Sequence, residues 1–421
     1  MATQLKTPAS ATNRSRLLVI FLTVFIDLVG FGIILPLSPF LAREFRASPL
    51  EVGLLMSIYS IMQFLFSPIW GALSDRIGRR PVILIGLCGG GLSYLLFAFS
   101  TTLPLLFVAR ALAGLFGGNI STAHAYIADV TTPEDRSKGM GLIGAAFGLG
   151  FIFGPLLGAG LGLLGQRLGS APPYGMSFSA LGAAALCFAN FALASVVLKE
   201  SLSPEFRNRP RVRKNRIKEI LRQMRAPISG PLMIVFFLSG LAMAEMESML
   251  FPYVADRFGW GLEKASMGFA YVGVLMVLTQ GYLIRKWMPR FGERRVLLVG
   301  LLAFAISLAF IPFSFSVALL AVSMTVLAVG NGMMRPPNLG LISIAARSDE
   351  QGAVLGVTNS LASLGRIVGP AVGGLMYERL GKGSPFWLAS ILAFAAFWMA
   401  WSTTTSLDQS RKKHSNETSS V

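Results

Sequence analysis

Long apolar blocks alternate along the chain with short polar segments. Each block is close to the ~20 residues that an α-helix needs to cross the hydrocarbon core of a bilayer. A soluble helical protein would instead break such blocks into stripes at helical spacing. The pattern therefore predicts an all-α membrane protein with twelve transmembrane helices, near 17–39, 51–73, 81–100, 103–127, 138–163, 175–198, 232–254, 265–285, 295–313, 317–342, 353–377 and 384–406.

A polar segment divides these predicted helices into six and six. It carries ten Lys or Arg residues against three Glu residues. We expect an N-terminal tail at 1–16, a six-helix bundle at 17–198, a basic linker at 199–231, a second six-helix bundle at 232–406 and a C-terminal tail at 407–421.

The two halves repeat each other at an offset of 214 to 216 residues. Gly150-Phe-Ile-Phe-Gly154-Pro155-Leu-Leu-Gly158 matches Gly365-Arg-Ile-Val-Gly369-Pro370-Ala-Val-Gly373. Leu35-Pro36 at the end of the first helix matches Phe251-Pro252 at the end of the seventh. Internal repeats of this kind are typical of secondary transporters, whose substrate site lies near the midplane between the repeats.

Composition and charge support the membrane assignment. The chain is 53% hydrophobic and 14% charged, whereas soluble domains are about a quarter charged. The net charge of +17 does not indicate nucleic-acid binding, because 27 of the 37 Lys and Arg residues fall in loops and tails predicted to face the cytoplasm. This asymmetry follows the positive-inside rule and predicts that both termini are cytoplasmic.

The loop between the second and third predicted helices carries a specific motif. Gly71 and Asp75 precede a glycine flanked by arginines, in the order Gly71-Ala-Leu-Ser-Asp75-Arg76-Ile-Gly78-Arg79-Arg80. This sequence resembles the signature loop of the major facilitator superfamily. The resemblance implies the major facilitator fold, two pseudo-symmetric bundles of six helices, and a cytoplasmic gate formed by this loop. A weaker copy lies in the second half, with Arg290, Gly292 and Arg294.

Three further motifs resemble those of the drug:proton antiporter branch, which includes tetracycline-efflux and multidrug-resistance proteins. They are Asp27-Leu-Val-Gly30-Phe-Gly32-Ile-Ile-Leu-Pro36, Arg110-Ala-Leu-Ala-Gly114-Leu-Phe-Gly117-Gly118, and the Gly150–Gly158 stretch, in which Ala159 replaces the last glycine of the family pattern. Glycines four residues apart permit close helix packing, and Pro155 frees a backbone carbonyl group. We therefore interpret Gly150, Gly154, Pro155 and Gly158 as a hinge; simple helix packing is the alternative.

Charged side chains inside predicted spans are candidates for proton coupling. Each costs ~2.5–3.5 kcal/mol at a helix centre on insertion scales and is therefore a functional candidate by default. We expect Asp27, Glu245 or Glu247 to carry the proton, with Arg110 as the partner that responds to it. Glu245 and Glu247 point about 200° apart on a regular helix, and we favour Glu247 slightly. Structural ion pairs are the alternative interpretation.

Arg335 and Arg366 add two more cations within the predicted spans of the second half. Either can meet an anionic group of a substrate or pair with the glutamates of the seventh helix. The sequence leaves both alternatives open, and we note the two arginines as a polar region of the substrate cavity.

The sequence as a whole predicts a secondary transporter that works by alternating access and exports drugs or amphipathic metabolites in exchange for protons. The alternative is an importer, symporter or facilitator for a sugar or another metabolite. Tetracycline-efflux relatives carry acidic residues in helices three and nine, but 81–100 and 295–313 contain none, which argues against tetracycline as the substrate.

The expected partners are a small molecule, protons and the bilayer. We expect a monomer in the cytoplasmic membrane with no nucleic-acid partner and no cofactor, powered by the proton gradient. Enzymatic activity is not expected, because the chain contains no phosphate-binding loop, zinc-protease motif or nucleophile elbow.

Overall fold

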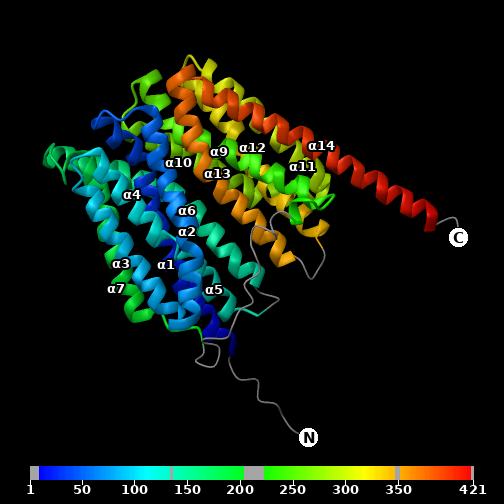
Figure 1. Ribbon diagram of the computed structural model, residues 1–421, viewed down its shortest axis with the longest axis horizontal. Coiled ribbons are helices and arrows are strands. Elements are labelled where there is room, and N and C mark those ends of the chain that lie inside the picture. The colour runs from blue at the N-terminus through cyan, green and yellow to red at the C-terminus, as the bar shows by residue number, and fades with distance from the viewer. Residues whose placement is uncertain (1–8, 133–135, 203–221, 347–350, 419–421) are drawn as a thin grey trace, which may run out of the picture. The chain divides into compact units, whose positions relative to one another are not determined.

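The computed structural model describes residues 9–132, 136–202, 222–346 and 351–418, and these residues fold into helices without a strand (Figure 1). The helices of the first half are α1 (Ala9–Glu44), α2 (Pro49–Ile77), α3 (Arg79–Ala98), α4 (Leu103–Gly117), α5 (Ile120–Val130), α6 (Arg136–Leu168) and α7 (Phe178–Val197). Those of the second half are α9 (Ser229–Phe258), α10 (Leu262–Leu278), α11 (Ile284–Phe310), α12 (Val317–Ala345), α13 (Gln351–Leu380) and α14 (Ser384–Thr418). Short single-turn elements are η1 (Gly175–Ser177), η3 (Thr279–Leu283) and η4 (Ile311–Phe313).

Within the described residues, ten helical segments are long and apolar enough to span a membrane. One of them, Leu262–Phe313, has 52 residues and is too long for a single crossing. It contains α10 and α11, and the backbone is non-helical at Gly292. The thirty-residue helix α13 is not among the ten segments but has the length of a span. Dividing Leu262–Phe313 at Gly292, which lies within α11, and adding α13 gives the twelve spans that the sequence predicted.

The fourth predicted span is interrupted. The sequence predicted one continuous helix over 103–127, but α4 ends at Gly117 and α5 begins at Ile120. A Cβ atom on Gly118 would lie 2.9 Å from Cδ1 of Trp70, and the Trp70 indole donates a hydrogen bond of 2.6 Å to the carbonyl oxygen of Leu115. Consecutive glycines thus let α2 approach the chain closely where the helix breaks.

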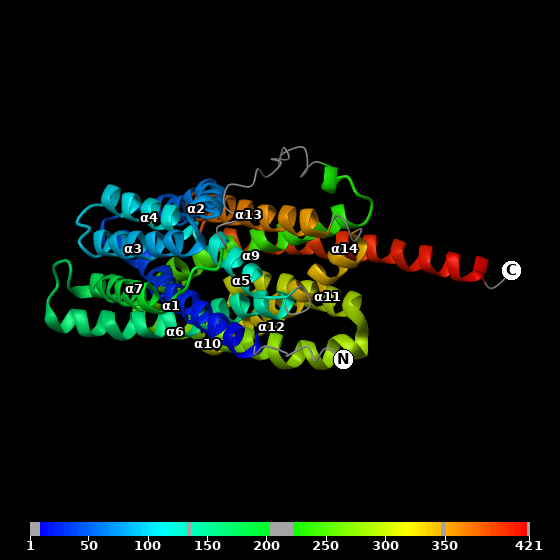
Figure 2. The ribbon, with the colours of Figure 1, turned by 90° about the horizontal axis from the view of Figure 1, so that it is seen from below.

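The chain forms two compact units. Unit 1 contains 1–47, 58–211 and 260–270, and unit 2 contains 48–57, 212–259 and 271–421. In unit 1, α1 packs against α6 and α7, and α3 packs against α7. In unit 2, α9 packs against α13 and α14, and α11 packs against α12 (Figure 2).

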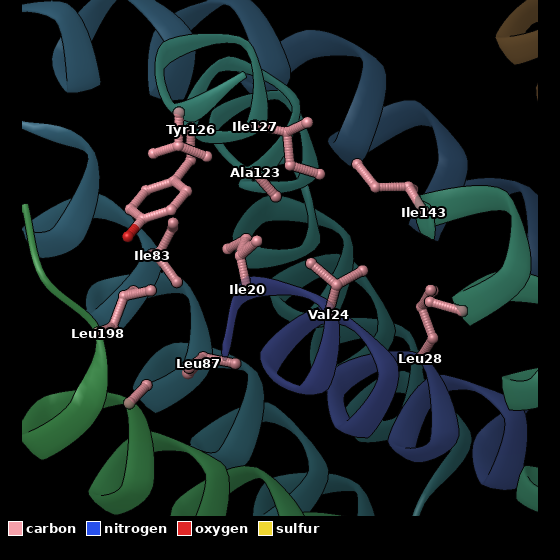
Figure 3. Packing of buried hydrophobic residues seen from close by; sticks show 13 residues of the cluster. Ile20, Val24, Leu28, Ile83, Leu87, Ala123, Tyr126, Ile127, Ile143 and Leu198 are labelled. Carbon is pink, nitrogen blue, oxygen red and sulfur yellow. The ribbon is translucent and has the colours of Figure 1, made fainter. Parts of the chain in front are cut away.

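The core of unit 1 is built on α1. Ile20, Val24 and Leu28 recur every four residues and therefore lie on one face of the helix (Figure 3). They pack against a cluster from α3, α5, α6 and α7 that includes Tyr126. The Tyr126 hydroxyl donates a hydrogen bond of 2.9 Å to the carbonyl oxygen of Lys199. This contact ties the core to the polypeptide that follows α7.

Large apolar side chains are also exposed on the outside of the helices. Val196, Trp398 and Ile391 are 85%, 72% and 64% exposed. A water-soluble protein rarely exposes apolar area on this scale, whereas hydrocarbon chains solvate it. These positions are therefore lipid-facing, and the chain is a multi-pass membrane protein.

Candidate functional site

The signature loop of the first half is organised around Arg79. Its side chain is 2% exposed, and its Nη1 atom lies 2.6 Å from Oδ1 of Asp75. Its Nε atom lies 3.0 Å from Oδ2 of Asp129, at the end of α5. Its Nη1 atom also donates a hydrogen bond of 2.6 Å to Oγ of Ser74. One guanidinium therefore joins the end of α2, the start of α3 and the end of α5.

The turn into α3 depends on Gly78. Its φ of 107° is one that residues with a Cβ atom rarely adopt, and a Cβ atom here would collide with the carboxylate of Glu200. That carboxylate accepts hydrogen bonds of 2.9 Å and 3.1 Å from the backbone N–H groups of Arg79 and Arg80. An anion at a helix N-terminus is stabilised by the helix dipole and by these unpaired N–H groups.

Two partners of this loop were missed by the sequence reasoning. Asp129 and Glu200 lie 50 and 121 residues from Arg79. Asp129 ends the stretch Ala125-Tyr-Ile-Ala-Asp129, which resembles the tetracycline-efflux group, and Glu200 follows the predicted span at 175–198, but the sequence did not pair either residue with the loop. Of the remaining arginines, Arg76 is exposed, and Arg80 donates a hydrogen bond to the carbonyl oxygen of Ser195.

The second loop has the same backbone but different contacts. Gly292 also has a positive φ, of 77°. Glu293 takes the place of Arg79 in the repeat, so the buried arginine is missing at that position. Arg294 donates a hydrogen bond of 2.8 Å to Oγ1 of Thr405 in α14, and the Arg290 guanidinium lies 5.8 Å from the Phe291 ring.

The glycines of the hinge motif lie in the contact between α1 and α6. A Cβ atom on Gly154 would lie 2.6 Å from Cα of Gly32 and 2.8 Å from the carbonyl oxygen of Val29. A Cβ atom on Gly150 would lie 2.9 Å from Cβ of Leu28, and one on Gly158 would lie 3.3 Å from Cγ2 of Ile33. We call this contact the first seam. Its glycines let the two backbones touch.

The second copy of the motif forms an equivalent contact between α9 and α13, the second seam. A Cβ atom on Gly369 would lie 2.9 Å from the carbonyl oxygen of Leu241, and one on Gly373 would lie 2.9 Å from Cγ of Glu245. Glu245 is 1% exposed, and neither of its carboxylate oxygens has a hydrogen-bond partner within the described part of the chain. A carboxyl group is thus buried in the seam itself.

Asp27 lies half-buried on α1, on another face from the first seam. Tyr94 of α3 and Cys187 of α7 are the groups with which it interacts electrostatically. The neighbouring Gly30 marks this contact, because a Cβ atom there would lie 3.4 Å from the Tyr94 ring and 3.5 Å from the Cys187 sulfur. Within the described residues, no cationic group acts on Asp27.

Arg110 and Asp27 interact electrostatically with the same residue, Tyr94 of α3. The Arg110 side chain is 1% exposed, and its guanidinium carbon lies 4.8 Å from the centroid of the Tyr59 ring. It also acts electrostatically on Tyr94, which in turn interacts with Asp27. Tyr94 therefore connects the two charged residues that the sequence paired. The Tyr59 ring also packs against Phe31, at a centroid distance of 5.1 Å.

Glu247 lies in different surroundings from Glu245. It is half-buried, and Arg335 of α12 and Arg366 of α13 both act on it electrostatically. The Arg335 guanidinium carbon lies 5.9 Å from the centroid of the Phe236 ring. Arg366 is exposed, and its Nη2 atom donates a hydrogen bond of 3.3 Å to Oγ of Ser363 on the same helix.

This arrangement suits binding and proton exchange rather than covalent chemistry. It consists of carboxyl groups, guanidinium groups and aromatic rings held within a membrane-spanning fold. No group of three His, Cys, Asp or Glu residues that could hold a metal ion occurs within the described ranges. These features define a polytopic transport protein.

Comparison with known proteins agrees with this class. The family model of the Major Facilitator Superfamily matches residues 20–291 and 282–420, and the chain belongs to this superfamily. It is 33% identical to the class C tetracycline resistance protein of Escherichia coli over 86% of this chain and 89% of the relative. It is 30% identical to multidrug resistance protein 1 of Bacillus subtilis over 91% of this chain and 96% of the relative.

Solved structures show the same fold. The human organic anion transporter MFSD10 superimposes with a TM-score of 0.69 and 26% identity, over 94% of this chain and 100% of that chain. A bacterial homologue of the lysosomal transporter Spinster superimposes with a TM-score of 0.74 and 14% identity, over 92% and 96% of the two chains. The protein is therefore a membrane transporter of small molecules with the major facilitator fold, and not an enzyme.

Proposed function

We propose that the protein exports small amphipathic molecules from the cytoplasm in exchange for protons. The transporter lies in the cytoplasmic membrane as a monomer with both termini inside, and the proton gradient supplies the energy. Two bundles, 17–198 and 232–406, move as the alternating halves, joined by the linker at 199–231. Residues 203–221 of that linker lie outside the described residues.

The direction of transport is supported by the relatives. Those at 30% identity or more include tetracycline and multidrug resistance proteins. Tetracycline itself is not the proposed substrate, because α3 and the span at 295–313 contain no acidic residue. The aromatic pair of Phe31 and Tyr59 beside Arg110 supplies the apolar surface that an amphipathic molecule requires.

The observation that carries the coupling proposal is the position of Asp27. A carboxylate within a span is costly, and no cation among the described residues compensates it. Such a carboxyl group gains by binding a proton from one side of the membrane and releases it where water reaches the site. Arg110 acts on this step through Tyr94.

The other charged residues take different roles. Glu247 remains with Arg335 and Arg366, with which it interacts electrostatically. Glu245 stays protonated within the second seam, because ionisation there would leave a buried charge without a partner. The network of Asp75, Arg79 and Asp129 serves as the cytoplasmic gate, since it is an ion-pair cluster that a movement of α2 against α3 and α5 would open.

The test uses purified protein in liposomes with a trapped pH dye and an imposed proton gradient. Substrate-induced proton movement in the wild type, lost in Asp27→Asn and retained in Glu247→Gln, supports the proposal. The matched control is Glu263→Gln, which removes an exposed carboxylate from the first turn of α10 and should change nothing.

Two other results would change the proposal. Proton movement that survives in Asp27→Asn but is lost in Glu247→Gln would mean that Glu247, and not Asp27, carries the coupling proton. Substrate flux without proton movement in the wild type contradicts antiport and indicates a facilitator.

A further inference from the structure

Asn190 of α7 has a buried side-chain oxygen atom to which the coupling step gives no role. The side chain is 1% exposed, and its Nδ2 atom donates a hydrogen bond of 2.8 Å to the backbone carbonyl oxygen of Thr23 on α1. A carbonyl oxygen only accepts hydrogen bonds, so this contact fixes the orientation of the amide. The Oδ1 atom then lies in the contact between the two helices without a donor among the described residues. Buried acceptors of this kind are usually completed by water.

This oxygen atom lies beside the part of α1 that carries Asp27. Thr23 and Asp27 are four residues apart and therefore share one face of α1. On α7, Cys187 is three residues from Asn190 on the same face, and it interacts electrostatically with Asp27. A Cβ atom on Gly30 would lie 3.5 Å from the Cys187 sulfur. The contacts of α7 with Thr23 and with Gly30 therefore lie on either side of Asp27.

The other titratable groups near Asp27 come from three further helices. Tyr94 of α3 interacts with Asp27 directly. Tyr59 of α2 and Arg110 of α4 act on Tyr94 in turn. The stretch of α6 in the first seam, 150–158, contains no titratable residue. An amide differs from all of these groups, because it does not ionise and can accept a hydrogen bond at any pH.

An apolar layer lies between Asn190 and the end of α7. Ile20, seven residues before Asp27 on α1, is 0% exposed and belongs to one cluster with Ala194 of α7 and Tyr126 of α5. Water beside Asn190 would therefore have apolar neighbours on that side. Such surroundings favour a site that holds a proton on Asp27 over one that conducts it along the helix.

We propose that Asn190 positions the coupling proton by holding one water molecule between its Oδ1 atom and the carboxyl group of Asp27. When Asp27 is protonated, its O–H group donates to the water and the water donates to Asn190. When Asp27 is ionised, the same water donates one hydrogen to the carboxylate and the other to Asn190. The inference rests on the proposed function, in which Asp27 carries the proton, and makes Asn190 a positioning residue rather than a carrier.

The test is infrared difference spectroscopy between low and high pH on the purified full chain, without substrate. The carbonyl band of protonated Asp27 is identified by its loss in Asp27→Asn. We expect this band to move to higher wavenumber in Asn190→Leu, because the carboxyl group loses a hydrogen-bond partner. Exchange into water labelled with heavy oxygen should also shift a water band of the wild type that is lost in both variants.

The matched control is Ser179→Ala on the same helix. The Ser179 hydroxyl donates a hydrogen bond of 2.7 Å to the carbonyl oxygen of Gly158, so this variant also removes a buried side-chain bond between α7 and a neighbouring helix. It should leave both bands unchanged. An unchanged Asp27 band in Asn190→Leu, or equal shifts in Asn190→Leu and Ser179→Ala, would overturn the proposal. If Asn190→Leu does not fold, the wild type still decides, since the lack of a water band that depends on Asp27 would exclude the bridge.

The infrared result is independent of the liposome assay. Wild-type protein that shows both bands but moves no protons with substrate would contradict the proposed antiport and leave the bridge standing. Proton movement by wild-type protein that lacks a carbonyl band from Asp27 would overturn the bridge and leave antiport with another carrier.

Discussion

The two seams of the molecule share a backbone arrangement but differ in chemistry. Each places the glycines of a G-x-x-x-G-P-x-x-G motif against a facing helix, α6 against α1 and α13 against α9. With Pro36 aligned on Pro252, Val29 takes the place of Glu245. Val29 is 5% exposed and Glu245 is 1% exposed. The same tight contact thus holds a valine in unit 1 and a carboxyl group in unit 2.

In the same alignment Phe31 corresponds to Glu247, two residues further along each helix. Phe31 packs on Tyr59, whereas Glu247 lies among arginines. Unit 1 therefore offers an aromatic surface where unit 2 offers charge. The comparison teaches that glycine spacing sets the geometry of the seams, and that the side chains between the glycines are then available for different functions.

The largest effect is expected from making the first seam resemble the second. Val29→Glu buries a carboxyl group in a contact formed by glycines and apolar side chains such as Leu28 and Ile33. Removal of compensation from a buried charge costs about 3–5 kcal/mol, so we expect little folded protein in the membrane fraction. Thr101→Glu is the control, because Thr101 is exposed in the loop between α3 and α4. Normal yield and thermal midpoint for Val29→Glu would show that the seam tolerates acid without adaptation.

Blocking the close approach should come next in magnitude. Gly154→Val and Gly369→Val place methyl groups where a Cβ atom already lies within 3 Å of backbone atoms. Overpacking of this kind typically destabilises by about 1–3 kcal/mol, and transport should fall in both variants. Gly160→Val on α6 and Gly356→Val on α13 are matched controls, since a Cβ atom at either glycine meets open space. Efflux and thermal midpoints that match the controls would show that neither stability nor transport requires the close helix contact at the two seams.

Replacing the acid of the second seam by the residue of the first should have a smaller effect, in the opposite direction. Glu245→Val removes two oxygens that lack partners among the described residues. Burying such a polar group costs about 1–3 kcal/mol, so the thermal midpoint in detergent should rise. Proton movement in liposomes should persist, because we propose that Asp27, and not Glu245, carries the coupling proton. A lower midpoint, or loss of coupling, would instead assign Glu245 an essential role.

The smallest effect concerns the two loops. Gly78 and Gly292 both have a positive φ, where a Cβ atom costs about 1–2 kcal/mol. At Gly78 the new methyl group would also collide with Glu200, whereas at Gly292 it meets open space. We therefore expect Gly78→Ala to lower stability and efflux more than Gly292→Ala does. The reverse order would argue against Glu200 as the group that holds the start of α3.

Several elements of this protein were readable from the sequence. Apolar blocks of spanning length predicted the helices, and the offset between the two glycine motifs predicted the repeat. The signature loop and the antiporter motifs predicted the superfamily, which the family model confirms. These features are local, because each depends on residues within one span, one loop or one motif.

The tertiary structure decided which side chains meet. It joined Arg79 to Asp129 and Glu200, which lie 50 and 121 residues away. It also placed Glu245 in a helix seam and Glu247, two residues later, beside two arginines. In a soluble protein, hydrophobic periodicity separates buried from exposed faces. In a membrane protein both the lipid-facing and the protein-facing sides of a helix are apolar, so hydropathy alone determines that a segment spans the bilayer but not which neighbour each side chain contacts.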